Sequence, residues 1–232
     1  MRYRFAMLGM TLLDAIAFAW FVIAWAGYAW LVDVVGRNGQ GLTQVMAAYR
    51  QRWMTEMLTR ANRIVDGQIN MTLQQGTAFF ASTSLIAVGG GLTLLGATDR
   101  AVEIVQALPL GYHPSREQWE VKVAGLTLIF VYAFFKFAWA YRLFNYCAIL
   151  IGATPDGDRS GTQEALVMAQ RAATMNTIAA SHFNRGQRAF FFALGYLGWF
   201  FGPVVLIVST AAVVFVIYRR QFLSNSLDAV RF

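Results

Sequence analysis

Four long apolar stretches run through the chain and alternate with segments that carry most of its charge. They are about Leu8–Val35, Thr77–Ala97, Val123–Ile151 and Phe190–Tyr218. About 20 consecutive apolar residues in a helix cross a hydrocarbon core of roughly 30 Å. The pattern predicts an all-α, polytopic helical membrane protein with four transmembrane helices, in a single membrane domain over residues 1–232.

Two amphipathic helical arms, at about residues 42–75 and 162–185, are predicted between the spans. In the first arm, apolar residues recur every three or four positions, which marks one face of a helix: Met46, Tyr49, Trp53 and Met57. The second arm has a face of small residues: Ala165, Ala169, Ala172, Ala173, Ala179 and Ala180. Four spans put both arms on one side of the membrane, where we expect these faces to pack together. The two termini and the connection at residues 98–120 are then expected on the other side.

The composition supports a membrane protein and argues against nucleic-acid binding. Charged residues make up 13% of the chain, whereas soluble domains contain roughly 25%. The net charge of +7 is spread along the chain, so it fits residues that flank spans and meet anionic lipid headgroups better than a clustered nucleic-acid site. The connection at residues 98–120 is the more acidic side, which favours arms in the cytoplasm of a protein of the bacterial inner membrane.

A metal or cofactor site is not predicted. Cys147 is the single cysteine, so the chain can form no internal disulfide. The two histidines, His113 and His182, are expected on opposite sides of the membrane, which separates them too far to share a metal ion.

Polar residues inside the predicted spans are candidates for a site. Lys136 lies near the middle of the third span, and Asp14 lies in the first. An ionisable group at the centre of a membrane helix costs roughly 2.5–3.5 kcal/mol on insertion, so it needs a partner or water. We expect Lys136 to pair with Asp14, as a structural ion pair or as the lining of a polar pathway; a lysine can also snorkel to an interface. Arg142 and Asn145 continue the third span toward the arms, where Arg142 is expected to reach headgroups or Asp66.

A second candidate site precedes the fourth span and contains His182, Asn184, Arg185 and Arg188. The planar guanidinium group of arginine suits bidentate contacts with phosphate or carboxylate. The start of a helix adds free backbone N–H groups and the positive end of its dipole. We expect an anionic headgroup or a phosphorylated ligand to bind here. The alternative is a capped helix end whose arginines face lipid.

Small residues inside the second and fourth spans are expected to let helices approach closely, since small-xxx-small pairs favour such contacts. They are Gly89, Gly90, Gly91, Gly198 and Gly202. Pro203 predicts a kink in the fourth span.

Three segments carry a resemblance to a known family. They are RQRWMTEMLTRANRIVDGQ at residues 50–68, GTAFFASTSLIAVGG at 76–90 and HFNRGQRAFFFALGYLGWFFGP at 182–203. These segments resemble an uncharacterised membrane family, the domain-of-unknown-function family 599. The resemblance implies a multi-span membrane protein of bacterial origin, and it implies no activity, cofactor or catalytic residue.

The leading functional hypothesis is a membrane protein without a catalytic site. It would act as a scaffold or as a partner- and lipid-binding subunit, self-associating as a homo-oligomer or within a larger complex, with anionic membrane lipids as partners. One alternative is a small channel or transporter whose pathway is lined by Lys136 and Asp14. A third hypothesis is a membrane enzyme that acts on a lipid phosphate at His182 and Arg185.

Overall fold

The described part of the chain, residues 9–34, 41–107 and 114–230 of a computed structural model, contains helices and no strand. The longer helices are α2 (Leu12–Val34), α3 (Leu42–Glu56), α4 (Ile64–Gly96), α6 (Arg116–Ala153), α7 (Gln163–Tyr196) and α8 (Pro203–Phe222). The shorter elements are η2 (Met57–Thr59), α5 (Thr98–Ala107), η3 (Gly157–Arg159), η4 (Leu197–Phe201) and α9 (Asn225–Asp228). The predicted all-α fold is confirmed. The two outermost residues of the predicted first span, 8 and 35, lie outside the described residues.

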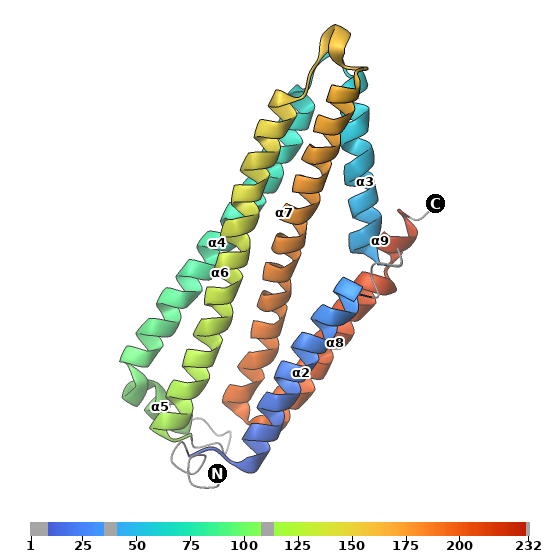
Figure 1. The fold of residues 1–232 in the computed structure, drawn as a ribbon. Helices are drawn as coiled ribbons and strands as arrows, with labels where there is room; N and C mark the ends of the chain where they lie inside the picture. Colours follow the sequence, from blue (N-terminus) through green and yellow to red (C-terminus); the bar gives the residue numbers. More distant parts are fainter. Residues whose placement is uncertain (1–8, 35–40, 108–113, 231–232) are drawn as a thin grey trace.

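The molecule is a long bundle with two distinct ends. We call the end with α5 and η4 the base, and the end with η2 and η3 the tip. The helices α4, α6 and α7 run side by side from base to tip (Figure 1). The shorter α2 and α8 pair with each other beside the half of α7 nearer the base, whereas α3 lies beside the half nearer the tip.

The helix lengths divide the bundle into two halves. α2 and α8 contain 23 and 20 residues, which matches a hydrocarbon core of roughly 30 Å. α4, α6 and α7 contain 33, 38 and 34 residues, so at about 1.5 Å per residue they extend well beyond it. Four helical stretches are long and apolar enough to cross a membrane: Leu12–Val34, Ile64–Gly96, Arg116–Ala153 and Pro203–Asp228. In the base half, large apolar side chains such as Ile86, Leu128 and Val208 are exposed on the outside, as contact with lipid requires.

The predicted fourth span, residues 190–218, is not a single helix. α7 ends at Tyr196, and η4 leads to Gly202, whose φ of 124° lies in the region that favours glycine. Pro203 then takes the first turn of α8, where its missing N–H leaves no hydrogen bond unmade. The kink expected at Pro203 is therefore a full reversal of the chain at the base.

This reversal brings the end of the chain to α3. The hydroxyl of Thr43 donates to Gln221 at 3.2 Å, and the hydroxyl of Tyr49 donates to the carbonyl of Val230 at 3.4 Å. The expectation that the C-terminal end shares a side with the connection at residues 98–120 is thereby corrected, because α8 runs back toward the arms.

The second half of α7 is a fifth segment of the base half. The indole of Trp199, in η4, donates to Asp14 at 2.8 Å near the base. At the other end of α2, Arg185 lies 3.1 Å from Asp33. These contacts place α7 and η4 antiparallel to α2 along its whole length. Five segments thus lie together here: α2, α8 and parts of α4, α6 and α7 (Figure 1).

The predicted arms are also divided differently. The first, at residues 42–75, consists of α3 and η2, a turn at residues 60–63 and the start of α4. The second, at residues 162–185, is the first part of α7. The first part of its alanine face packs on Trp53, Met54 and Met57. Trp53 and Met57 belong to the face expected from the sequence, whereas Met46 of that face lies outside this cluster.

A buried carboxylate closes the tip. Asp66 is 0% exposed, and it accepts hydrogen bonds from the indole of Trp53 at 2.6 Å and from Arg60. Arg63 donates to two carbonyl groups of the opposite turn. Because Asp66 is engaged inside the tip, the contact expected between Asp66 and Arg142 is not formed.

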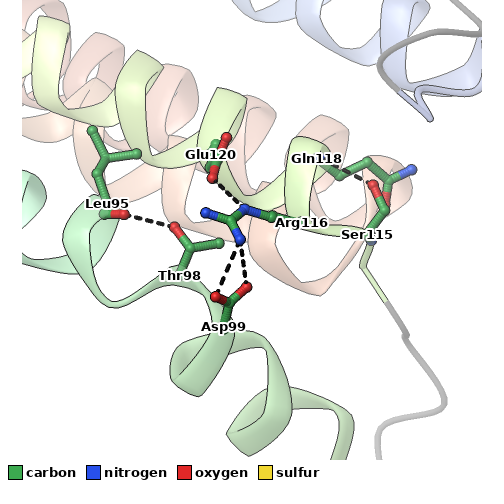
Figure 2. A network of polar contacts seen from close by, with 7 residues as sticks. All are labelled: Leu95, Thr98, Asp99, Ser115, Arg116, Gln118 and Glu120. Carbon is green, nitrogen blue, oxygen red and sulfur yellow. Dashed lines mark hydrogen bonds and ion pairs between the residues drawn. The ribbon is translucent and has the colours of Figure 1, made fainter.

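An exposed polar network holds α5 against α6 at the base (Figure 2). Arg116 donates to Glu120 and to Asp99, both at 2.9 Å. Ser115 and Gln118 form a reciprocal cap at the start of α6. Ion pairs this exposed contribute little to stability, so the network orients α5 more than it stabilises the bundle.

The glycines predicted at helix contacts fall into two groups. A Cβ atom at Gly91 would lie 2.1 Å from the hydroxyl of Thr127, and one at Gly198 would lie 2.4 Å from the hydroxyl of Ser209. These two glycines permit close approach. At the other three, Gly89, Gly90 and Gly202, a Cβ atom would have no neighbour within 4 Å. Gly89 and Gly90 face outward, and Gly202 forms the chain reversal.

Candidate functional site

Two buried charged residues near the base, Asp14 and Lys122, both contact Trp199. Asp14 accepts hydrogen bonds from the indole of Trp199 at 2.8 Å and from the hydroxyl of Thr11 at 2.6 Å. Lys122 donates to the main-chain oxygen of Trp199 at 2.8 Å, with its ammonium 5.4 Å from the centre of the Trp199 ring. Asp14 and Lys122 are 3% and 1% exposed. We call Asp14, Lys122 and Trp199 the base cluster; it carries one negative and one positive charge, and both converge on one residue.

The expected pair of Lys136 and Asp14 is not formed. Lys136 lies about four turns farther along α6 than Lys122, which is roughly 21 Å. Its ammonium lies 5.2 Å from the centre of the Tyr132 ring. Lys136 and Asp14 therefore do not meet within the chain, and the channel hypothesis stays a prediction.

Lys136 instead lines a groove of about 420 Å³ on the outside of α6 and α7. We call it the α6 groove, and its residues are Phe135, Lys136, Ala138, Trp139, Arg142 and His182. The Nε atom of Arg142 donates to the hydroxyl of Tyr146 at 2.6 Å. Asn145 does not reach this groove's lining; it accepts a hydrogen bond from Gln74 at 2.8 Å and joins α6 to α4.

Two adjoining cavities, of about 360 and 390 Å³, lie where the ends of α2 and α8 meet α3 and α7. Five residues line both: Val32, Thr43, Arg50, Asn184 and Arg188. We call the two together the junction cavity. Of the four residues predicted to bind an anion, Asn184, Arg185 and Arg188 line it, and His182 lies apart in the α6 groove.

One carboxylate faces the arginines of the junction cavity. Asp33, at the end of α2, lies 3.1 Å from Arg185 and 3.5 Å from Arg188. The Asp33 and Arg185 side chains are 39% and 37% exposed, whereas Arg188 is 13% exposed. Asp33 can offset one positive charge, so it leaves the cavity with an excess of cationic groups.

Two further arginines come from α3 and α8. Arg50 donates from Nε to Asn176 at 2.9 Å, and burial lowers the pKa of its guanidinium because the charged form loses solvation. The group still stays protonated, since an arginine pKa lies far above neutral pH. Arg220 lies with its guanidinium carbon 5.6 Å from the centre of the Phe191 ring. The residues that line the junction cavity therefore include four guanidinium groups and one carboxylate.

Neutral hydrogen-bonding side chains complete the wall. Asn184 and Gln187 come from α7, Thr43 from α3, and Ser224 and Ser226 from the end of the chain. Guanidinium groups with amide and hydroxyl neighbours suit a group that carries several oxygen acceptors and a negative charge. The arrangement can hold a phosphate or carboxylate.

Metal-ligand clusters of three or more His, Cys, Asp or Glu side chains do not occur among residues 9–34, 41–107 and 114–230. The thiol of Cys147 is buried and contacts the carbonyl of Ala172 at 3.5 Å. His113 lies outside the described residues.

A family model matches residues 16–226, a range that contains every residue of the junction cavity. Its description is protein of unknown function, DUF599. The chain belongs to the DUF599 family. The resemblance seen in three sequence segments is thereby confirmed over most of the chain. No curated protein and no solved structure matches the chain.

Sequence reasoning missed Arg50, Arg220 and Lys122 as members of polar sites. It places Arg50 on the arm and Arg220 at the end of a span on the opposite side. The available signal was Gly202 followed by Pro203, which is the pattern of a chain reversal before a new helix. A reversal at that point returns α8 to the arms and brings Arg220 toward the other arginines.

Proposed function

We propose that the base half crosses the membrane as five helical segments. The start of α2 and the end of α8 then lie on opposite faces, and the tip half projects from one face. The length of α2 supports this placement, and so does the antiparallel course of α7 and η4 beside it. The inner membrane of a bacterium remains the predicted location.

The distribution of positive charge supports a cytoplasmic tip. Of the 15 lysines and arginines in the described residues, Arg100, Arg116 and Lys122 belong to the base. The other 12 lie within about one turn of Asp33 or farther toward the tip. Short cytoplasmic segments carry an excess of Lys and Arg, so the tip, the junction cavity and the end of α8 face the cytoplasm.

Reporter fusions test this placement. A cytoplasm-active fluorescent reporter and a periplasm-active phosphatase are each fused to the N-terminus and to the C-terminus. The C-terminal fluorescent fusion and the N-terminal phosphatase fusion are expected to be active. Activity of the same reporter at both ends would show an even number of crossings and overturn the five-segment placement.

At the cytoplasmic boundary, the junction cavity binds an anionic group, a phosphate or a carboxylate, carried by a lipid headgroup or by a soluble molecule. The observation that carries this function is that four guanidinium groups and one carboxylate line two adjoining cavities. Like charges gathered in one place repel each other, so an anion would relieve that repulsion. The protein is thus a membrane-embedded anion-binding protein, which keeps the lipid-binding form of the sequence hypothesis.

Thermal unfolding of the detergent-purified protein tests this function. The probes are inorganic phosphate, dihexanoylphosphatidylglycerol and dihexanoylphosphatidylcholine. A ligand of the folded state raises the unfolding temperature. Phosphate or the anionic phosphatidylglycerol is therefore expected to stabilise the protein more than the zwitterionic phosphatidylcholine. A rise in unfolding temperature with phosphate alone identifies a soluble ligand, whereas a rise with phosphatidylglycerol alone identifies a lipid headgroup.

Variants locate the response. Arg50→Gln combined with Arg188→Gln is expected to abolish it, and the milder Arg220→Gln is expected to weaken it. Arg171→Gln is the matched control, because Arg171 is an exposed arginine of α7 that does not line the cavity. A wild-type protein that responds to none of the anions, or a double variant that responds as strongly as the control, would overturn the proposal. Self-association and a scaffold role remain predictions.

A further inference from the structure

We propose that the α6 groove is a second site, which takes an anionic phospholipid from the surrounding leaflet. The proposal rests on the membrane placement proposed above and not on occupancy of the junction cavity. The α6 groove and the junction cavity have no lining residue in common, so binding at each can be tested without the other.

The groove combines the two chemistries of a phospholipid. Lys136, Arg142 and His182 supply basic groups, and no acidic residue lines the groove. Phe135 and Trp139 are 65% and 47% exposed, so they present apolar surface beside the basic groups. A phosphate would lie on the basic residues while the first part of an acyl chain runs along the aromatic ones.

The groove also lies at the right depth. His182 is one turn before Arg185 on α7, and Arg185 pairs with Asp33 at the end of α2. In the proposed placement this is the level where one leaflet's hydrocarbon meets its headgroups. Trp139 fits that level, because tryptophan collects at membrane interfaces.

The basic groups are held in place without being neutralised. Lys136 rests over the ring of Tyr132, and Arg142 is fixed by the hydroxyl of Tyr146. Neither makes an ion pair with a carboxylate of the described residues. The Nδ1 atom of His182 is buried and has no hydrogen-bond partner among the described residues.

Photolabelling in nanodiscs tests this site. Phosphatidylglycerol and phosphatidylcholine that carry a diazirine near the headgroup are used in parallel, and labelled peptides are mapped by mass spectrometry. A basic residue near an anionic membrane surface favours association by about fivefold. In the wild-type protein, residues 135–142 are expected to be labelled at least about fivefold more by phosphatidylglycerol than by phosphatidylcholine.

The variants separate this site from the junction cavity. Lys136→Gln combined with Arg142→Gln is expected to remove the preference, while labelling by phosphatidylcholine stays unchanged and reports a folded protein. Arg50→Gln combined with Arg188→Gln is expected to keep the preference at the groove. Equal labelling by both lipids in the wild-type protein, or a preference that survives the Lys136 and Arg142 changes, would overturn the proposal. A preference lost in the junction variant would also overturn it as an independent site.

Discussion

The base cluster and the junction cavity both bring charged residues together, at the two ends of α2, yet they differ in charge balance and in packing. In the base cluster, Asp14 and Lys122 are almost fully buried and each contacts Trp199. In the junction cavity, four arginines and one carboxylate, Asp33, line open space, and two of the arginines pair with Asp33. The base has matched charge and little space, whereas the junction has both excess charge and space.

This difference distinguishes a structural role from a binding role. Buried charged groups whose hydrogen bonds are made within the chain need no ligand, and removing one of them disturbs the packing around the other. Arginines that outnumber the carboxylates around a cavity are stabilised most by an anionic ligand, which the chain itself does not supply. The comparison predicts that changes at the base alter stability, whereas changes at the junction alter ligand response.

The largest effect is expected for Lys122→Met. The change removes the hydrogen bond from Lys122 to the main-chain oxygen of Trp199 and the positive charge nearest to buried Asp14, so the free energy of unfolding should fall by about 3 kcal/mol. Denaturant unfolding in detergent measures it, with Lys136→Met as the matched lysine change on the same helix. The double variant with Asp14→Asn should lose less than the two single losses added together. Additive losses would show that the two charges are not coupled.

A smaller effect is expected for Gly125→Ala, which tests how tightly the base half is packed. A Cβ atom at Gly125 would lie 2.1 Å from the hydroxyl of Tyr196, and Tyr196 is 1% exposed. Overpacking of this kind costs about 1–3 kcal/mol. Gly90→Ala is the control, because nothing lies within 4 Å of its Cβ position, and there alanine should be neutral or slightly stabilising. Thermal unfolding of both variants decides, and equal stabilities would contradict the close packing.

At the junction, Arg188→Gln alone should change the free energy of unfolding by about 1 kcal/mol or less. Arg185 still pairs with Asp33 in this variant, and one of several like charges is removed. The same change should weaken the response to the anionic probes. Unfolding measured with and without phosphate separates the two effects. A loss of stability as large as that of Lys122→Met would mean that the junction is structural too.

The smallest effect is expected at the exposed network of Figure 2. Arg116 is 58% exposed, and its partners Asp99 and Glu120 are 78% and 40% exposed. Arg116→Gln should cost less than about 1 kcal/mol, and the cost should shrink as salt is added because surface ion pairs are screened. Unfolding at low and high salt measures this, and a cost independent of salt would argue against an electrostatic origin.

The sequence was sufficient to predict the helical membrane architecture, because long apolar stretches allow few other structures. The contact of the alanine face of α7 with Trp53 of α3 and Met57 of η2 was also predictable. Helix direction was harder: the apolar run at residues 190–218 continues through Gly202 and Pro203, so hydropathy alone hides the reversal there. That one turn moves the C-terminal end to the opposite side and changes which residues can meet.

The site was predicted in part for the same reason. Asn184, Arg185 and Arg188 are neighbours in sequence, so their cluster was visible before the fold. Arg50 and Arg220 join them through tertiary structure. Lys136 looked central because the apolar run around it continues toward the tip, yet α2 and α8 place it near the boundary of the base half. For a helix longer than the bilayer is thick, the helix sequence alone does not show which part of it crosses the membrane.

The most direct test compares the two regions in one measurement. The unfolding temperature is recorded with and without inorganic phosphate or dihexanoylphosphatidylglycerol for three proteins: wild type, Asp14→Asn with Lys122→Met, and Arg50→Gln with Arg188→Gln. We expect the base variant to unfold at a lower temperature and still gain the wild-type increment from the anion. The junction variant should lose that increment. An increment that disappears in the base variant and persists in the junction variant would contradict the assignment of structure to the base and anion binding to the junction.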